Sequence, residues 1–249
     1  MCHDVDSRPP AAPVTTGGVA AHGPLEITAG DGNRFPAYRA LPTHPNGRSV
    51  LLLPDLRGAH PFYLLLAQRF AEAGFRTLVM DYYGRSAGTA PRGESFDGAA
   101  HMASLKPEHV ETDAAAAVAA LREEDEGPVL SVGFCLGGGY SWRLAAAGLG
   151  LAGAVGFYGP PRFFEDRAEE VSAPLLMLLA GEDVATTPEQ FDALAGRLER
   201  AGKAYERHVY AGAPHSFFDD SFARWADACA DSWHRLLGFV ERHSPVAAA

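Results

Sequence analysis

A short stretch of sequence, Gly-Phe-Cys-Leu-Gly at residues 133–137, constrains the fold of this chain more than any other feature. An apolar run at residues 129–132 precedes it and a helical pattern at residues 140–147 follows it, which predicts a strand, a sharp turn and a helix. Glycines two positions before and after Cys135 allow a strained turn without Cβ clashes. The positive end of the following helix would favour a thiolate there. We interpret Cys135 as a reactive residue; a merely buried cysteine is the alternative.

Apolar runs alternate with helical patterns along the rest of the chain. This order is typical of a mostly parallel sheet with helices on both faces, so the sequence predicts an α/β fold. A hairpin is expected at residues 25–28 and 35–40, because the Gly- and Asp-rich residues between them form turns. The other expected strands are residues 49–54, 75–80, 129–132, 151–157, 174–180 and 205–210, and the expected helices are residues 62–73, 107–122, 140–147, 188–200 and 222–240.

Length and charge limit the classes of protein that this chain can represent. With 249 residues and 47% hydrophobic content, we expect one domain at residues 24–249 after a loosely ordered tail at residues 1–23. That tail lacks the basic and apolar regions of a secretory signal. The formal net charge of −10 argues against nucleic acid as a partner, and the lack of a long apolar run argues against a membrane span.

The cysteines give a further indication of the class and location. Cys2, Cys135 and Cys229 are odd in number and do not have the spacing of metal ligands. The sequence therefore predicts neither a disulfide scaffold nor a metal site, and a reducing, cytoplasmic location is expected.

Two further strand ends carry residues that complete a catalytic set with Cys135. Asp183 follows the run at residues 175–180, and His215 follows the run at residues 205–210. Cysteine, acid and histidine stand in the chain order of an α/β-hydrolase triad, in which the histidine removes the thiol proton and the carboxylate orients the imidazole. Asp183 could instead be a turn residue with Glu182 as the acid, and His215 could be an ordinary loop histidine.

The sequence resembles the dienelactone hydrolase family of α/β-hydrolases. The resemblance rests on residues 133–138, 181–183 and 212–217, with weaker matches at residues 55–58 and 81–85. It implies a cofactor-free, carboxymethylenebutenolidase-type hydrolase of small esters or lactones that works through a thioester. Cys135 would attack the carbonyl, His215 would act as base and then acid, and Asp183 would orient His215. The backbone N–H groups of Leu56 and Leu136 would form the oxyanion hole.

The family pattern also implies substrate contacts, from which this chain departs twice. Asp55 stands where the family has a glutamate that contacts the thiol, and it could instead pair with Arg57. Arg85 matches the first of two arginines that hold a substrate carboxylate, but the second is missing, because Phe, Asp and Asp follow residue 217. We therefore expect an apolar pocket. Its candidate lining residues are Tyr82, Tyr83, Tyr158, Phe217 and Phe218, for each of which ordinary core packing is the alternative.

Two further questions stay open at this point. The glycine-rich residues 85–105 show no periodicity, and we expect this loop to act as a partial lid. The same fold could catalyse a non-hydrolytic acyl transfer, a cyclisation or an isomerisation, or use the thiol for binding or redox sensing without catalysis. A small-molecule substrate is the expected partner, and both a monomer and a homodimer fit the sequence.

Overall fold

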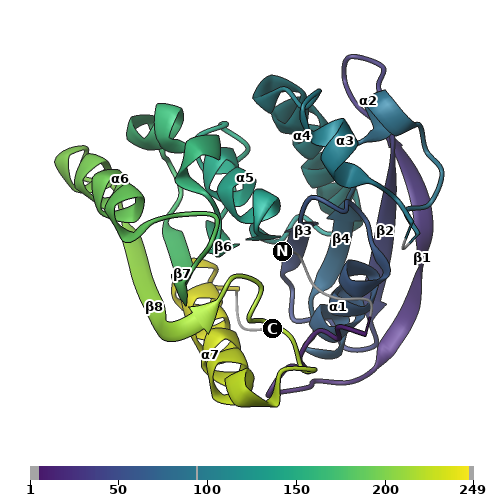
Figure 1. The fold of residues 1–249 in the computed structure, drawn as a ribbon. Helices are drawn as coiled ribbons and strands as arrows, with labels where there is room; N and C mark the ends of the chain where they lie inside the picture. Colours follow the sequence, from purple (N-terminus) through teal and green to yellow (C-terminus); the bar gives the residue numbers. More distant parts are fainter. Residues whose placement is uncertain (1–5, 94, 247–249) are drawn as a thin grey trace.

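A twisted, mostly parallel sheet runs through the molecule. The computed structural model describes residues 6–93 and 95–246. In this part of the chain, eight strands form one sheet in the order β1-β2-β4-β3-β5-β6-β7-β8 (Figure 1). The β1–β2 and β2–β4 pairs are antiparallel and all other pairs are parallel, which confirms the predicted α/β class. The strands are β1 (Val19–Thr28), β2 (Arg34–Pro42), β3 (Ser49–Leu53), β4 (Arg76–Met80), β5 (Val129–Phe134), β6 (Gly153–Phe157), β7 (Leu175–Glu182) and β8 (Tyr205–Pro214).

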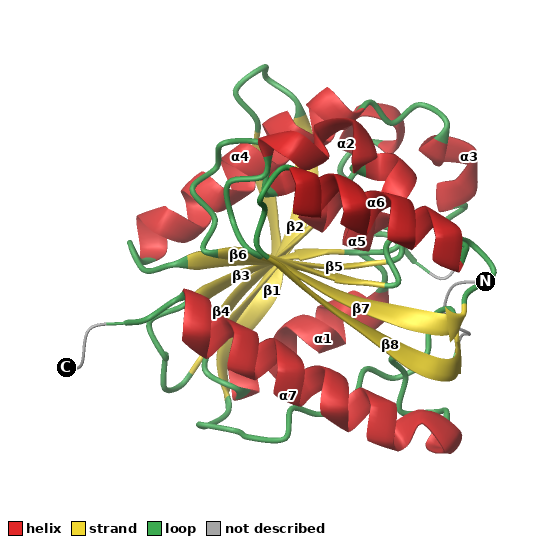
Figure 2. Cartoon of the chain, turned by 90° about the vertical axis from the view of Figure 1, so that its left-hand side faces the viewer, coloured by secondary structure: helices red, strands yellow, loops and turns green. Residues whose placement is uncertain are grey.

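Helices cover both faces of the sheet, as Figure 2 shows. One face carries α1 (Pro61–Glu72) and α7 (Ala226–His243). The opposite face carries α4 (Pro107–Glu124), α5 (Leu136–Leu144) and α6 (Pro188–Arg200), together with the short helices α2 (Gly84–Ala87) and α3 (Gly98–Met102).

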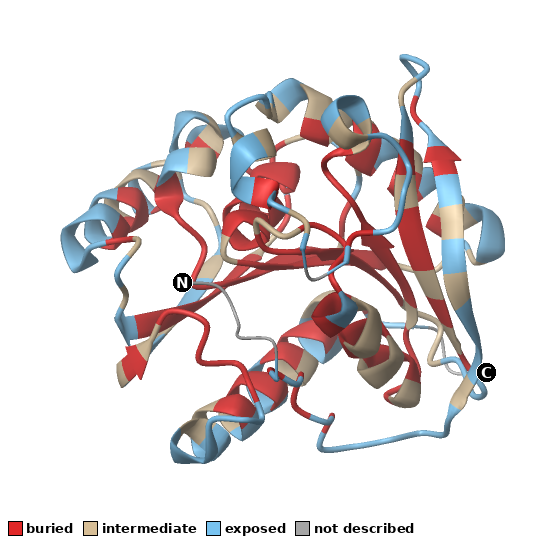
Figure 3. Cartoon of the chain, turned by 45° about the vertical axis from the view of Figure 1, so that its right-hand side comes forward, coloured by how far each residue is buried: buried red, intermediate tan, exposed pale blue. Residues whose placement is uncertain are grey.

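The covered sheet explains the unbroken apolar runs of the sequence. Every residue of β3, β5 and β6 is buried, and burial concentrates along the sheet and the inner faces of the helices (Figure 3). Side chains alternate between the two faces of a strand, so Leu51 and Leu53 join the apolar cluster on one side while Val50 and Leu52 join the other. The sheet therefore has a hydrophobic core on each face.

The N-terminal segment differs from the loosely ordered tail that the sequence predicts. β1 begins at Val19, and the hairpin with β2 extends to Pro42. Before the hairpin, the backbone carbonyl of Pro10 accepts a hydrogen bond from the indole of Trp233 on α7 at 3.2 Å, and Ala12 is buried. The boundary at residue 23 is thus corrected, because contacts with distant residues order a segment that has no periodic pattern of its own. Residues 1–5, including Cys2, lie outside the described part of the chain.

Residues 85–105 also differ from the predicted irregular loop, because they include most of α2 and all of α3. Helices of four and five residues are too short to show a hydrophobic period. Arg92 fixes the segment from within: it is 5% exposed and its guanidinium lies 2.9 Å from the carboxylate of Asp81. The function of this segment as a lid stays a prediction.

Candidate active site

Cys135 lies in a strained turn between β5 and α5. Its φ of 52° and ψ of −119° place a non-glycine residue in a conformation that L-amino acids rarely adopt. The Cys135 N–H donates to the carbonyl of Phe157 at 3.0 Å, which ties the turn to β6. A Cβ on Gly133 would lie 1.9 Å from the carbonyl oxygen of Gly137, so the turn needs glycine there. The strand, sharp turn and helix agree with the sequence prediction.

The ends of β7 and β8 bring Asp183 and His215 together. The two strands are parallel neighbours, and Glu182 faces Pro214 in their register, so the next residue of each strand lies at the same edge. His215 Nδ1 lies 2.9 and 3.0 Å from the two carboxylate oxygens of Asp183. The N–H of Ala185 donates to this carboxylate at 2.7 Å and helps to orient it. Asp183, and not the exposed Glu182, is therefore the partner of the histidine.

The surroundings of His215 favour its charged form. Burial opposes a charge on the imidazole, but the hydrogen bond with Asp183 and the hydrogen bond and charge interaction with Cys135 outweigh it. Together they raise the pKa of His215 to about 9. Because Nδ1 faces Asp183, Nε2 is the nitrogen left for the thiol. The cysteine, histidine and aspartate that the sequence predicts are thus in one hydrogen-bonded set.

A pocket of about 170 Å³ opens onto Cys135 and His215. Apolar residues make up most of its wall, and its volume suits a short substrate. A wider, open depression of about 800 Å³ beside the end of α4 is lined by none of the triad residues. The residues of the catalytic pocket are Leu56, Met102, Cys135, Leu136, Pro160, Arg162, Phe163, Ala185 and His215.

The two predicted oxyanion-hole residues line this pocket from different elements. Leu136 is the first residue of α5, where a backbone N–H has no acceptor within its own helix. Leu56 follows β3 in a turn that two buried tyrosines hold. The hydroxyl of Tyr82 donates to the carbonyl of Pro54 at 2.8 Å, and that of Tyr83 donates to the carbonyl of Leu56 at 2.7 Å. The two tyrosine hydroxyls therefore hold the turn in place, as a preorganised N–H donor at Leu56 requires.

Asp55 forms an ion pair with Arg57, which is the alternative that the sequence left open. The carboxylate is 1% exposed and lies 2.9 Å from the guanidinium. It also accepts the backbone N–H of Arg57 at 2.8 Å. The carboxylate thus stabilises the turn that carries Leu56.

Arg85 does not line the catalytic pocket, so the predicted contact with a substrate carboxylate is corrected. Its guanidinium lies 2.7 Å from the carboxylate of Asp31 in the β1–β2 turn and 2.7 Å from that of Asp113 on α4. Asn33 also donates to Asp113, at 3.0 Å. Two carboxylates therefore already neutralise the arginine that matches the family position.

The aromatic residues predicted to line the pocket belong instead to the core. Phe217 and Phe218 are 0% and 1% exposed, and the ring of Phe218 packs 4.8 Å from that of Phe157. Tyr82 is 2% exposed. Tyr158 is fully buried, but its ring lies 4.9 Å from the imidazole of His215. Of these residues, Tyr158 supports the catalytic histidine, whereas the others form part of the packed interior.

One part of the pocket wall was not predicted from the sequence. Pro160, Arg162 and Phe163 follow the carboxyl end of β6, and Met102 comes from the end of α3. A strand end with an arginine was a usable signal for Arg162, because ligands gather at the carboxyl ends of parallel strands. No sequence pattern connects Met102 with this site.

Asp219 stands where the family pattern has its second arginine, and it holds the N-terminal segment. Its carboxylate is 0% exposed and accepts the backbone N–H groups of Arg8 at 3.0 Å and Ser221 at 2.9 Å. The N–H of Asp220 in turn donates to the carbonyl of Arg8 at 2.8 Å. Residues 6–12 are thus tied to the loop that follows His215.

We expect Asp219→Ala to lower the free energy of unfolding by about 1–3 kcal/mol, because the backbone N–H groups of Arg8 and Ser221 would lose their acceptor. Urea denaturation measures this loss, and hydrogen exchange should show faster exchange of the Arg8 amide. Asp227→Ala, at an exposed position of α7, is the control and should change neither. An unchanged exchange rate of the Arg8 amide in Asp219→Ala would contradict the hydrogen bond between Arg8 and Asp219.

Comparison with known proteins agrees with this geometry. The model of the dienelactone hydrolase family matches residues 35–244. The chain belongs to the dienelactone hydrolase family. It is 28% identical, over an alignment of 272 positions, to a carboxymethylenebutenolidase of Rhodococcus opacus, with 100% of each chain covered.

Solved structures show the same fold. A dienelactone hydrolase-like promiscuous phosphotriesterase from metagenomic libraries superposes with a TM-score of 0.76 at 22% identity, covering 91% of this chain and 100% of the other. An esterase of Pyrococcus furiosus superposes with a TM-score of 0.67 at 14% identity, covering 96% and 100%. The predicted α/β-hydrolase fold is confirmed, and membership in the dienelactone hydrolase family makes the chain a hydrolase of the ester and lactone type.

Residues 6–93 and 95–246 of this dienelactone hydrolase family member lack two further features. None of its helices there combines the length and apolar character needed to cross a bilayer. No cluster of three or more His, Cys, Asp or Glu side chains in the same residues has the arrangement of a metal site.

Proposed function

We propose that this protein hydrolyses a small carboxylic ester or lactone, in a carboxymethylenebutenolidase-type reaction, through Cys135, His215 and Asp183. The observation that carries the proposal is the hydrogen-bonded set of these three side chains, of which Cys135 and His215 line a small pocket. A binding or redox-sensing thiol has no need of an imidazole held in place by a buried carboxylate.

In the acylation half of the reaction, His215 Nε2 accepts the thiol proton and the sulfur of Cys135 attacks the carbonyl carbon. The backbone N–H groups of Leu56 and Leu136 donate to the resulting oxyanion. When the tetrahedral intermediate collapses, the bond to the leaving oxygen breaks and His215 gives that oxygen its proton. A thioester on Cys135 and a free alcohol result; in a lactone the alcohol stays attached to the acyl group.

In the deacylation half, His215 accepts a proton from a water molecule whose oxygen attacks the thioester carbonyl. The carbon–sulfur bond then breaks, the carboxylic acid leaves and the thiol is restored. Asp183 takes no proton in either half, since its task is to orient the imidazole and stabilise its positive charge.

The test combines alkylation of the thiol with hydrolysis of an aryl ester in a Cys2→Ser background. We expect iodoacetamide to abolish activity in step with the modification of one residue, Cys135, because burial raises the pKa of Cys229 to about 11. The kcat/KM for the ester should fall as the pH rises through about 9, where His215 loses the proton that it gives to the leaving group.

Three outcomes would contradict the proposal. Activity that survives complete alkylation of Cys135 would exclude the thiol nucleophile. A kcat/KM that keeps rising beyond pH 10 would show that the protonated imidazole is not required. A reactive thiol without turnover of any ester or lactone would favour a non-hydrolytic reaction or a thiol-based binding protein.

A further inference from the structure

Among the described residues that line the catalytic pocket, one charged residue stands apart from the triad. Arg162 lies in the short 3₁₀ turn Pro161–Phe163 that follows β6, and it lines the pocket together with Cys135 and His215. The other wall residues are apolar. A guanidinium beside the reactive pair in such a wall is the natural partner for a negatively charged group.

The positive charge of Arg162 is available to a ligand. In residues 6–93 and 95–246, no carboxylate forms an ion pair with Arg162, and its side chain is exposed. Its guanidinium carbon lies 4.7 Å from the centre of the Phe163 ring, a contact that orients the group without neutralising it. Arg57 and Arg85, by contrast, are paired with carboxylates.

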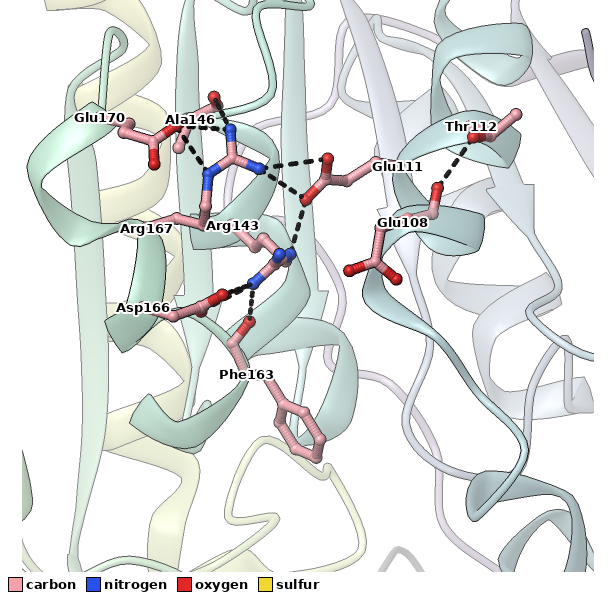
Figure 4. A network of polar contacts seen from close by, with 9 residues as sticks. All are labelled: Glu108, Glu111, Thr112, Arg143, Ala146, Phe163, Asp166, Arg167 and Glu170. Carbon is pink, nitrogen blue, oxygen red and sulfur yellow. Dashed lines mark hydrogen bonds and ion pairs between the residues drawn. The ribbon is translucent and has the colours of Figure 1, made fainter.

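A network of polar contacts around the buried Arg143 fixes the turn that carries Arg162 (Figure 4). Arg143 on α5 is 4% exposed; it donates to the Phe163 carbonyl at 3.4 Å and to the Asp166 carboxylate at 2.7 Å. Its Nε donates to Glu111 on α4 at 2.6 Å, and Arg167 approaches the same carboxylate at 3.2 Å. The helix that begins after the nucleophile therefore also positions the turn. A rigid support lowers the entropic cost of holding a ligand.

We propose that Arg162 binds a carboxylate of the substrate, so that the enzyme acts on short esters or lactones that carry one anionic group. This inference rests on the proposed function. It assigns anion recognition to the end of β6, whereas the resemblance had implied Arg85 at the end of β4. A planar guanidinium can hold a carboxylate with two parallel hydrogen bonds while the apolar wall takes the rest of the acyl chain.

The test compares two aryl esters of equal size, a hemiglutarate and its neutral isostere, a 5-oxohexanoate, with rates corrected for spontaneous hydrolysis. We expect the wild type to prefer the hemiglutarate. Arg162→Ala should lower kcat/KM for it about 10–100-fold, mainly through KM, because a hydrogen-bonded charge contact is lost. The value for the neutral ester should stay within about twofold, since binding of the apolar chain is retained. Arg162→Lys should keep part of the preference for the hemiglutarate. The ammonium group retains the positive charge but lacks the planar guanidinium that forms two parallel hydrogen bonds.

Arg224→Ala is the matched control. Arg224 is also exposed and also stacks on an aromatic ring, 5.0 Å from the centre of Trp225, but it does not line the catalytic pocket. We expect this variant to have the wild-type kcat/KM for both esters. Equal losses for the two esters in Arg162→Ala, or an undiminished preference for the anionic ester, would overturn the proposal.

A binding measurement separates this proposal from the proposed function. Glutarate should protect Cys135 of the wild type from alkylation by neutral iodoacetamide, relative to chloride at the same ionic strength, and should not protect Arg162→Ala. This readout requires no turnover. Protection without hydrolysis of either ester would support Arg162 as the anion site while contradicting hydrolysis. Hydrolysis of the esters with equal protection of the wild type and Arg162→Ala would support the proposed function and contradict Arg162 as the anion site.

Discussion

Cys135→Ala is expected to lower kcat/KM for an aryl ester by about 10⁴-fold or more, the size of effect seen when a nucleophile is removed from a triad. The methyl group cannot form the thioester, and the remaining N–H donors and His215 can only assist direct attack by water. The measurement is the initial rate of hydrolysis at matched protein concentration, with circular dichroism to show that the fold is retained.

Cys229→Ala serves as the control for the loss of a thiol. Cys229 is 3% exposed on α7 and donates to the carbonyl of Phe217 at 3.4 Å, so it belongs to the core. We expect its replacement to leave kcat/KM within about twofold, because it does not touch the pocket. Comparable activity in the two variants would refute Cys135 as the nucleophile.

Gly133→Ala is expected to lower the stability of the protein strongly. Its Cβ would lie 1.9 Å from the carbonyl oxygen of Gly137, in a turn that already strains Cys135. The backbone has to move, at a cost of about 3 kcal/mol. That corresponds to a fall in Tm of about 6–12 °C for a chain of this size. The shifted thiol should also lose most of its activity, since small displacements matter in a catalytic set.

Gly23→Ala is the comparison for that variant. Gly23 lies in β1, and a Cβ there would meet no atom within 4 Å. Its Tm is expected to stay within about 2 °C of the wild type, because a methyl group added into open space changes stability little. A Gly133→Ala protein with wild-type Tm and activity would show that the turn tolerates a side chain there.

Charge recognition in this molecule depends on which carboxylates lie near each arginine. Arg85 occupies the position that the family pattern assigns to a substrate contact, yet Asp31 and Asp113 converge on it from the hairpin and from α4. Arg162 lines the pocket and forms no ion pair with any carboxylate of residues 6–93 and 95–246. The proposal that Arg162 binds the substrate carboxylate follows from this difference in pairing.

The elements of the triad were predictable because local sequence fixes each of them. The glycines around Cys135 allow the strained turn, and Asp183 and His215 each directly follow a strand that the sequence predicts. Parallel neighbouring strands then place their ends at one edge. The choice of Asp183 over Glu182 was not predictable, because it depends on which side chain faces β8.

By itself, the sequence determined the α/β class, the order of strands and helices, and the strained turn at Cys135, since these follow from hydrophobic periodicity and the backbone freedom of glycine. Only the tertiary structure decided the partners of the charged and aromatic side chains: Arg85 with Asp31 and Asp113, Asp219 with Arg8, and Phe218 with the core. Those contacts join residues 28 to 211 positions apart. Electrostatic and packing energies depend on distance in space, which no local pattern of residues encodes.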